Sequence, residues 1–495
     1  MKNIYNSLIA ICIVTIFVSC NDELTKEPIG LLTLDQIDTT PTITTLESSV
    51  SSSYQLLAST LNLIGEWNWD GGAVLRNDFI LQDIAANDMN KKWNPDGDQA
   101  WMDELSAFSF TPDNGAFNGI WLYDYEGINR INLAISYLTN PEVTQEVGIA
   151  DARKNQLLGE AYFLRAFYYF DLVNNFGDVP LLTVPLKSFE EAFDVAVRVP
   201  STEIWIQINS DLTEAKTLLP NVKYPDPSEP WRASKGAVIA LQAKAALFNE
   251  DWTSVISLVN ELDALGFYSL NANYFDSFDV TKEFVDNEVI FAYDHVSDQN
   301  PRKGNGLCAL IGWGFIAPNE DFINAFEPND PRLLYTVDVA NQNVSKLLGN
   351  TVGDYKGNDD APSNKIYIRY ADVLLWKAEA LNETGDYPGA IAIINQVRTR
   401  ARTTPTADGS MVPIGTLADR PSSTDSAQIK GWLMSERRVE LGFESQRFND
   451  LKRWGTAKSV LTGLGKNFQD KNYLYPIPQG EVDKSGGTIT QNPDY

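Results

Sequence analysis

The chain has 495 residues, of which 43% are hydrophobic and 11% aromatic, enough for a large core. Its 66 acidic side chains exceed its 39 lysines and arginines, and the net charge of −27 argues against nucleic-acid binding, which needs a basic surface. With one histidine, His295, and no H-E-x-x-H, C-x-x-C, G-x-S-x-G or P-loop motif, the sequence also argues against zinc hydrolysis and triad catalysis. Glycoside hydrolysis by a pair of carboxylates remains a possible function, because a catalytic pair cannot be recognised by eye among so many acidic residues.

The N-terminus has the features of a lipoprotein signal. An apolar run over residues 8–17 is too short to span a bilayer, and Ser19 places a small residue before Cys20. We predict that residues 1–19 are a signal peptide and that Cys20 is lipidated, which anchors the chain to a membrane. An ordinary secretory signal is the alternative. Cys308 is the only other cysteine of the predicted mature chain, so no disulfide framework is expected.

Tryptophans gather in loop-like sequence near the N-terminus. The stretch 87–101, NDMNKKWNPDGDQAW, mixes indole rings with carboxylates and amides. A sugar ring offers an apolar face for stacking and hydroxyls for hydrogen bonds, so these residue types predict a carbohydrate site. Its candidate residues are Trp67, Trp69, Asp88, Asn90, Trp93, Asp98 and Trp101. For Trp67, Trp69 and Trp101, packing beneath the loop is the alternative. Asp96-Gly97-Asp98 could hold calcium, but the EF-hand spacing is missing and no metal site is predicted.

A buried helix is predicted from Gly159. The run GEAYFLRAFYYFDLVNNFGDVPL is apolar nearly all round, with Glu160, Arg165 and Asp171 as its only charges before the breaker Gly177.

Two later segments repeat one helical-hairpin pattern at a constant offset. Ala243 overlays Ala378, and Asp251 overlays Asp386. This small-residue pattern resembles the tetratricopeptide repeat, in which small side chains let two helices approach closely. About a hundred residues separate the copies, with strand-like pieces such as 288–296 between Gly/Asn/Asp-rich loops. The predicted fold is therefore mainly α, a tetratricopeptide-like scaffold with a loop-rich insertion containing short strands. The insertion supplies the second wall of the predicted site, with His295, Asn305 and Trp313.

Charged residues interrupt an apolar stripe near the C-terminus. The positions Ile429, Leu433, Glu436, Glu440, Phe443 and Arg447 keep helical spacing. Because an unpaired buried charge costs several kcal/mol, we interpret the carboxylates as part of a structural ion-pair network that includes the adjacent Arg437 and Arg438. Trp376, Trp432 and Trp454 lie within helical patterns and are predicted to be core.

Five motifs together resemble the RagB/SusD family of outer-membrane glycan-binding lipoproteins. They are GEAYFLRAFYYF with FGDVPL, IYIRYADVLLWKAEALNETGD, INQVRTRA, ERRVELGFESQRFNDLKRWG and LYPIPQGEVDKSGGTITQNPDY. The resemblance implies a right-handed arc of helix pairs, and a single unit over 20–495 with ligand-binding loops at about 62–118 and 268–364. It also implies a non-catalytic role: capture of a glycan at the cell exterior and delivery to a SusC-like TonB-dependent transporter. No cofactor is implied.

The leading hypothesis is thus a glycan-binding lipoprotein of the outer membrane that faces the cell exterior. An all-helical glycoside hydrolase and a protein-binding repeat adaptor are the alternatives. The hydrolase needs two carboxylates opposed across a cleft, whereas the adaptor needs no sugar site.

Overall fold

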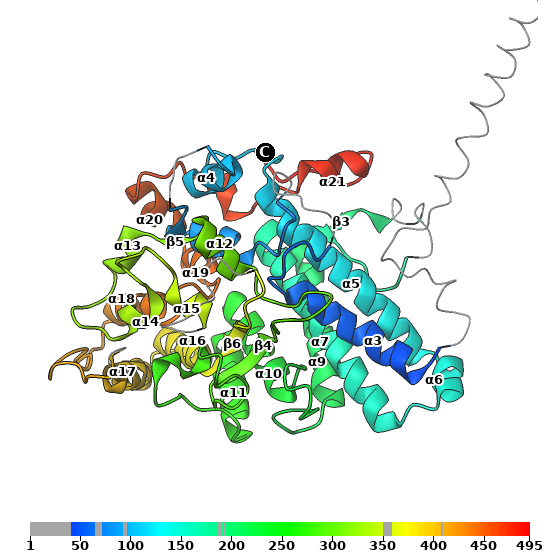
Figure 1. Cartoon of the computed structure of the whole chain (residues 1–495), viewed down its shortest axis with the longest axis horizontal. Helices are drawn as coiled ribbons and strands as arrows, with labels where there is room; N and C mark the ends of the chain where they lie inside the picture. The colour runs from blue at the N-terminus through cyan, green and yellow to red at the C-terminus, as the bar shows by residue number, and fades with distance from the viewer. Residues whose placement is uncertain are drawn as a thin grey trace, which may run out of the picture.

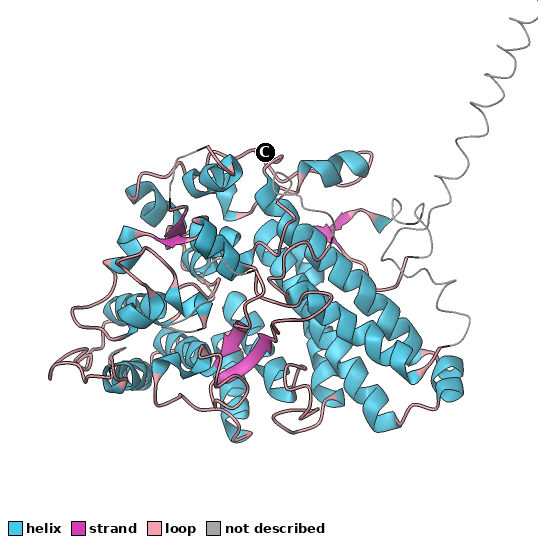
Figure 2. Ribbon diagram, viewed as in Figure 1, coloured by secondary structure: helices cyan, strands magenta, loops and turns pink. Residues whose placement is uncertain are grey.

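Helices dominate the computed structural model, as the sequence predicts (Figure 2). It describes residues 41–64, 72–92, 97–186, 191, 195–349, 359–406 and 409–495. Within these ranges the strands are short and form three two-stranded antiparallel sheets.

The first part of the scaffold is a run of long helices, each of which packs against the next. Figure 1 shows α3, α5, α7 and α9 side by side. The run consists of α3 (Ile43–Tyr54), α5 (Asn118–Thr139), α7 (Asp151–Phe176), α9 (Ser201–Leu218), α10 (Lys235–Phe248) and α11 (Trp252–Ala264). Shorter elements lie between them: η1 (Gln55–Leu57), the π-helical turn η2 (Ile80–Ile84), α4 (Ala100–Ala107), η3 (Gly115–Phe117), α6 (Pro141–Val147), and the paired strands β2 (Val179–Pro180) and β3 (Arg198–Val199).

Helix α7 is the predicted buried helix. It begins eight residues earlier than the apolar run and ends at Phe176, where Gly177 takes a positive φ of 74°. Charged side chains of the apolar run pair with residues of other segments. Glu160 accepts a hydrogen bond from Arg232 at 2.8 Å, and Arg165 binds Asp211 of α9 through two bonds of 2.7 and 2.8 Å. Ion pairing offsets the cost of burying these charges in a helix that is apolar nearly all round.

The two predicted repeat copies are adjacent hairpins, α10–α11 and α16 (Tyr370–Glu383) with α17 (Tyr387–Thr403). Helix α11 packs directly against α16, so the residues between them form an insertion at the side of a continuous helical array. Asp251 and Asp386, overlaid in sequence, both cap the second helix of their hairpin and accept backbone hydrogen bonds at 3.1 and 3.0 Å. The internal repeat is confirmed.

The insertion begins and ends at one small sheet. Strand β4 (Val289–Tyr293) pairs with β6 (Lys365–Arg369), so the predicted strand at 288–296 is confirmed over its first part. Between these strands lie α12 (Leu307–Trp313), β5 (Ala317–Pro318), α13 (Glu320–Ile323), α14 (Arg332–Thr336) and α15 (Ser345–Leu348), with η4 (Tyr274–Ser277) before them.

The C-terminal region starts with α18 (Ser426–Glu440), which packs on α16 and α17 around an apolar cluster. The predicted helical line is wrong beyond Glu440. Phe443 takes a left-handed φ of 66°, and Gly442 lies so close to the Phe322 ring that a Cβ there would be 2.3 Å from it. The chain then continues through α19 (Arg447–Arg453), α20 (Ala457–Gly463), η5 (Asp470–Tyr473) and α21 (Gln479–Lys484).

A buried ion-pair network joins this region to the insertion, as predicted. Glu440 accepts hydrogen bonds from Arg332 at 2.9 Å and from Arg369 at 2.7 Å, and it also contacts Arg400. Burial alone would raise the pKa of Glu440, but the guanidinium groups of Arg400, Arg369 and Arg332 outweigh it and hold that pKa below its usual value.

The predicted partners in that network were wrong. Arg437 binds Asp372 and Asp450, while Arg438 binds Asp88 and Asp321. The arginines that reach Glu436 and Glu440 come instead from α14, β6 and α17, which are remote in sequence and were therefore invisible to a local pattern.

Two of the three tryptophans predicted to be core residues are buried. Trp376 is fully buried and Trp454 is buried, whereas Trp432 is only half-buried.

Among the residues that the structure describes, no helix is both long enough and apolar enough to cross a bilayer.

Candidate functional site

The two predicted loop regions meet at a short sheet. Strand β1 (Met89–Asn90) pairs antiparallel with β5, with Met89 opposite Pro318 and Asn90 opposite Ala317. Next to it, the backbone amide of Lys92 donates to the carbonyl of Gly314 at 2.8 Å. The N-terminal loop is thereby fixed against the insertion at the end of helix α12.

Trp313 is the last residue of α12 and lies beside this junction. Its helix is anchored by the buried residues 307–311, and Gly314 ends it with a positive φ of 85°. Trp313 is 42% exposed, whereas the other tryptophans in the described ranges are buried or half-buried. A partly exposed indole ring at a helix end can stack on the apolar face of a sugar.

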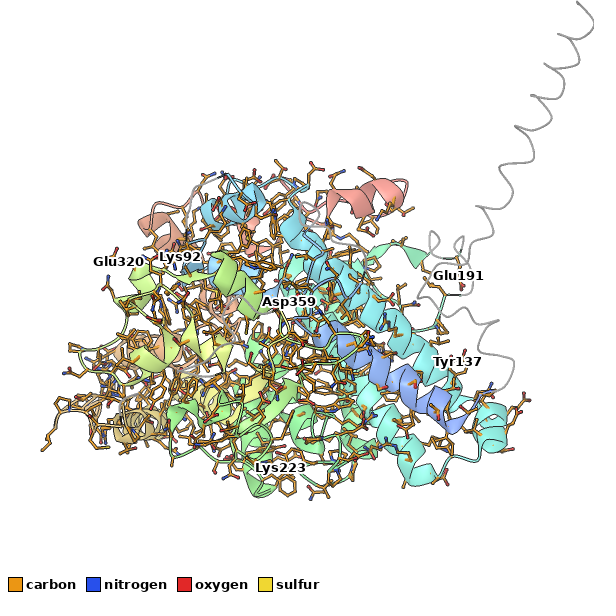
Figure 3. All side chains as sticks on the ribbon, in the orientation of Figure 1. Lys92, Tyr137, Glu191, Lys223, Glu320 and Asp359 are labelled. Atoms are coloured by element: carbon orange, nitrogen blue, oxygen red, sulfur yellow. The ribbon has the colours of Figure 1, made fainter. Side chains whose placement is uncertain are left out.

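Polar groups surround the junction. Asn90 is half-buried and donates to the Lys91 carbonyl at 2.9 Å, while Asp98 is exposed. The Lys92 ammonium donates to the carbonyl of Asn341 at 2.6 Å. Figure 3 shows Lys92 and Glu320 on the same edge of the molecule. This region combines an exposed indole with carboxylate, amide and ammonium groups, which can stack on and hydrogen-bond a polyhydroxylated ligand.

Lys92 and Asn341 were absent from the predicted set. The lysine pair Lys91-Lys92 inside the Asn/Asp-rich stretch was the available signal for the first. Asn341 belongs to a turn closed by Asp338, whose carboxylate accepts from the Asn341 backbone at 3.1 Å, and no sequence pattern placed that turn beside residue 92.

Four of the candidate ligand-binding residues are buried, so their side chains do not face solvent in this structure. Asp88 is 1% exposed and accepts two hydrogen bonds from Arg438, at 2.8 and 3.0 Å. Asn305 is 2% exposed and donates to the Ser363 carbonyl at 2.9 Å. Both side chains hold neighbouring segments together, because each is enclosed with its partner.

Trp101 and His295 are the other two buried candidate residues. Trp101 packs in the core with its indole N–H on Gln99 at 2.7 Å, which agrees with the alternative of packing beneath the loop. His295 is 2% exposed and accepts from the Ser59 backbone amide at 3.1 Å. Burial and then the Lys365 ammonium lower the pKa of His295 to about 3. An enclosed, neutral imidazole is not placed to act as a general base on a ligand from solvent.

Four further predictions lie outside the described residues: Trp67, Trp69 and Trp93 as ligand contacts, and Cys20 as the lipidated residue. Asp96, from the weighed calcium motif, also lies outside them. In the described part of the chain, no group of three or more His, Cys, Asp or Glu side chains is arranged to hold a metal ion.

Two family models match separate parts of the chain. One, described as "SusD family", matches residues 339–472, and the other, described as "Starch-binding associating with outer membrane", matches residues 37–247. Among curated proteins, "SusD-like protein P2" of Formosa agariphila is 25% identical over 97% of this chain and 97% of its own length.

Solved structures share the fold. Surface glycan-binding protein A from Bacteroides fluxus is 24% identical, with a TM-score of 0.74 over 92% of this chain and 100% of that chain. Surface glycan-binding protein A from Bacteroides thetaiotaomicron, solved in complex with laminarihexaose, is 21% identical, with a TM-score of 0.71 over 91% of this chain and 99% of that chain. Both of these proteins are named as surface glycan-binding proteins. The chain belongs to the SusD/RagB family.

Proposed function

We propose that this protein is a non-catalytic glycan-binding lipoprotein of the outer-membrane surface, and that its ligand stacks on Trp313 where the two loop regions meet. The single observation that carries the proposal is the exposure of Trp313, 42%, on a helix end fixed against the N-terminal loop. Trp93 follows directly after Lys92 in the sequence, and we propose it as a second ligand contact. Asn90 and Asp98 supply hydrogen-bonding groups.

Glycan as the ligand class is supported by the relatives. The laminarihexaose complex and the starch-binding family description both concern glucose polymers, so laminarin and starch are the first ligands to test. Delivery of the glycan to a SusC-like TonB-dependent transporter, and attachment through lipid on Cys20, are further parts of the proposal. They are supported by the family's described association with the outer membrane and by the N-terminal signal pattern.

The test uses the full chain carrying Cys20→Ala, probed on a carbohydrate array that includes laminarin and starch. A stacked indole that buries about 80 Å² contributes about 2 kcal/mol at about 25 cal/mol per Å². Trp313→Ala and Trp93→Ala should therefore each weaken binding at least tenfold, and Trp313→Ala should leave the melting temperature near that of the unsubstituted chain, because its ring is exposed. Trp252→Ala, which truncates a half-buried tryptophan on α11, is the matched control and should leave affinity unchanged.

Three outcomes contradict the proposal in different ways. If a folded Trp313→Ala chain binds as tightly as the unsubstituted chain, the site lies elsewhere. If bound glycan is released as shorter products, and replacing one acidic residue stops this, the chain is a hydrolase. If the array retains nothing, the repeats serve a protein partner and the aromatic loop does not bind sugar.

A further inference from the structure

A cleft lies at the C-terminal end of the helical array, around the half-buried Trp432. It has a volume of about 480 Å³ and is open to solvent. Its walls are the turn 327–329, helix α17 through Arg398, helix α18 through Trp432, and the loop 413–421. In Figure 1, α17 lies apart from α12. The cleft is within the size range of small-ligand sites.

The loop wall of this cleft is fixed by side chains of α17. Asn395 bonds both backbone groups of Arg420, at 2.7 and 3.0 Å. Arg398 donates twice to the carbonyl of Ala418, at 2.9 and 3.0 Å, and Arg402 donates to the carbonyl of Leu417 at 3.0 Å. A loop held in this way keeps its shape in the absence of a ligand, which lowers the entropic cost of binding.

The charges that line the cleft balance one another. Glu327 pairs with Arg398 at 2.8 Å and with Arg420 at 2.6 Å. Asp419, which also lines the cleft, pairs with Arg402 at 2.6 Å. Hydroxyl groups both donate and accept hydrogen bonds, so a neutral polyhydroxylated ligand matches this lining, whereas the carboxylates would repel a strongly anionic ligand and the guanidinium groups a strongly cationic one.

Arg420 lies beside the Trp432 ring. Its guanidinium carbon is 6.0 Å from the ring centre, and among the residues that the structure describes its Nε–H has no hydrogen-bond partner. The Arg420 side chain is 23% exposed, so its guanidinium N–H groups can donate to a hydroxyl of a ligand in the cleft.

We propose that the Trp432 cleft is a second carbohydrate site, which takes a neutral sugar residue with Trp432 as the stacking surface and Arg420 as a donor. It uses none of the residues of the Trp313 site. The two sites therefore bind independently, and a polysaccharide can engage either of them.

The experiment compares variants of the full Cys20→Ala chain on an array of neutral and acidic glycans. Trp313→Ala removes the first site, and neutral glycans should still be retained, more weakly. Adding Trp432→Ala should lower that residual binding at least tenfold, and adding Arg420→Leu should lower it severalfold. Trp432→Phe, which keeps an aromatic face, should preserve most of it and shows whether a loss reflects the ring or the packing of α18. Arg420 belongs to the loop and not to α18, so Arg420→Leu still tests the second site if Trp432→Ala fails to fold.

The outcomes separate this inference from the proposed function. If Trp313→Ala alone abolishes neutral-glycan binding, the first site stands and the second is overturned. If residual binding is untouched by both cleft substitutions, or is confined to acidic glycans, the second site is also overturned. If only the Trp432 and Arg420 substitutions reduce binding, the second site stands and the placement at Trp313 is wrong. An array that retains no glycan overturns both.

Discussion

The backbone amide of Ser59 donates a hydrogen bond of 3.1 Å to Nε2 of His295, and so joins the N-terminal helices to the insertion. The bond requires Nε2 to be unprotonated, which matches the buried, neutral state of the imidazole. The only histidine of the chain is therefore a structural acceptor, 236 positions away from its donor.

This relationship predicts a pH dependence of stability. The folded pKa of His295, about 3, lies below the unfolded value of about 6.5, so between these values the unfolded chain binds the extra proton. The contribution is fully present above about pH 6.5 and is lost as pH falls toward 3, by at most about 1.4 kcal/mol per pH unit. His295→Gln keeps an acceptor but does not titrate. Between pH 7 and pH 5, the unsubstituted chain should lose about 2 kcal/mol more of its free energy of unfolding than the variant, measured in denaturant. Equal losses in the two chains would contradict the buried, neutral state.

Glu440 should be among the most sensitive charged positions. Glu440→Gln leaves Arg332, Arg369 and Arg400 without their shared carboxylate in a buried site, so we expect a destabilisation of about 3–5 kcal/mol. Chemical denaturation measures the effect. Glu261→Gln is the control, because its pair with Lys216 is partly exposed and should be worth less than about 1 kcal/mol. Similar small losses at both positions would show that the buried network does not stabilise the fold.

Trp376→Ala should destabilise the scaffold and spare the ligand sites. Trp376 is fully buried in α16, so the truncation leaves a cavity that costs about 3–5 kcal/mol. Trp376→Phe should cost less, since the ring fills part of that space. Thermal and denaturant unfolding give the stability, and the glycan array gives the affinity of the fraction that stays folded. A specific loss of affinity at unchanged stability would mean that this part of the repeat takes part in binding.

The lipid anchor is tested by Cys20→Ala. Labelled palmitate should enter the unsubstituted chain and not the variant, and the variant should leave the membrane fraction, because stable attachment requires acyl chains. Cys308→Ala is the matched control: its thiol is buried, so lipid incorporation should be unchanged. Equal labelling of the unsubstituted chain and the Cys20→Ala variant would leave an ordinary secretory signal as the better interpretation.

Local patterns predicted those features of the scaffold that neighbouring residues control. The matched caps Asp251 and Asp386 and the small residues Ala243 and Ala378 depend on contacts within one helix or hairpin, and the apolar run of α7 is visible in its own periodicity. Periodicity failed beyond Glu440, where Gly442 lies against the Phe322 ring and Phe443 takes a positive φ of 66°. Spacing along one segment carries no information about a distant ring.

The sequence by itself determined the helical repeat class, the position of the insertion and the need to pair the charges on buried stripes, because these follow from side-chain periodicity and the cost of burying charge. Only the tertiary structure decided which candidate binding residues face solvent. Asp88 is enclosed by Arg438, 350 positions later, while Trp313, in a similar glycine-rich setting to Asn305, stays exposed at a helix end. Burial is a property of the surfaces that long-range contacts bring together, and residue type alone does not specify those contacts.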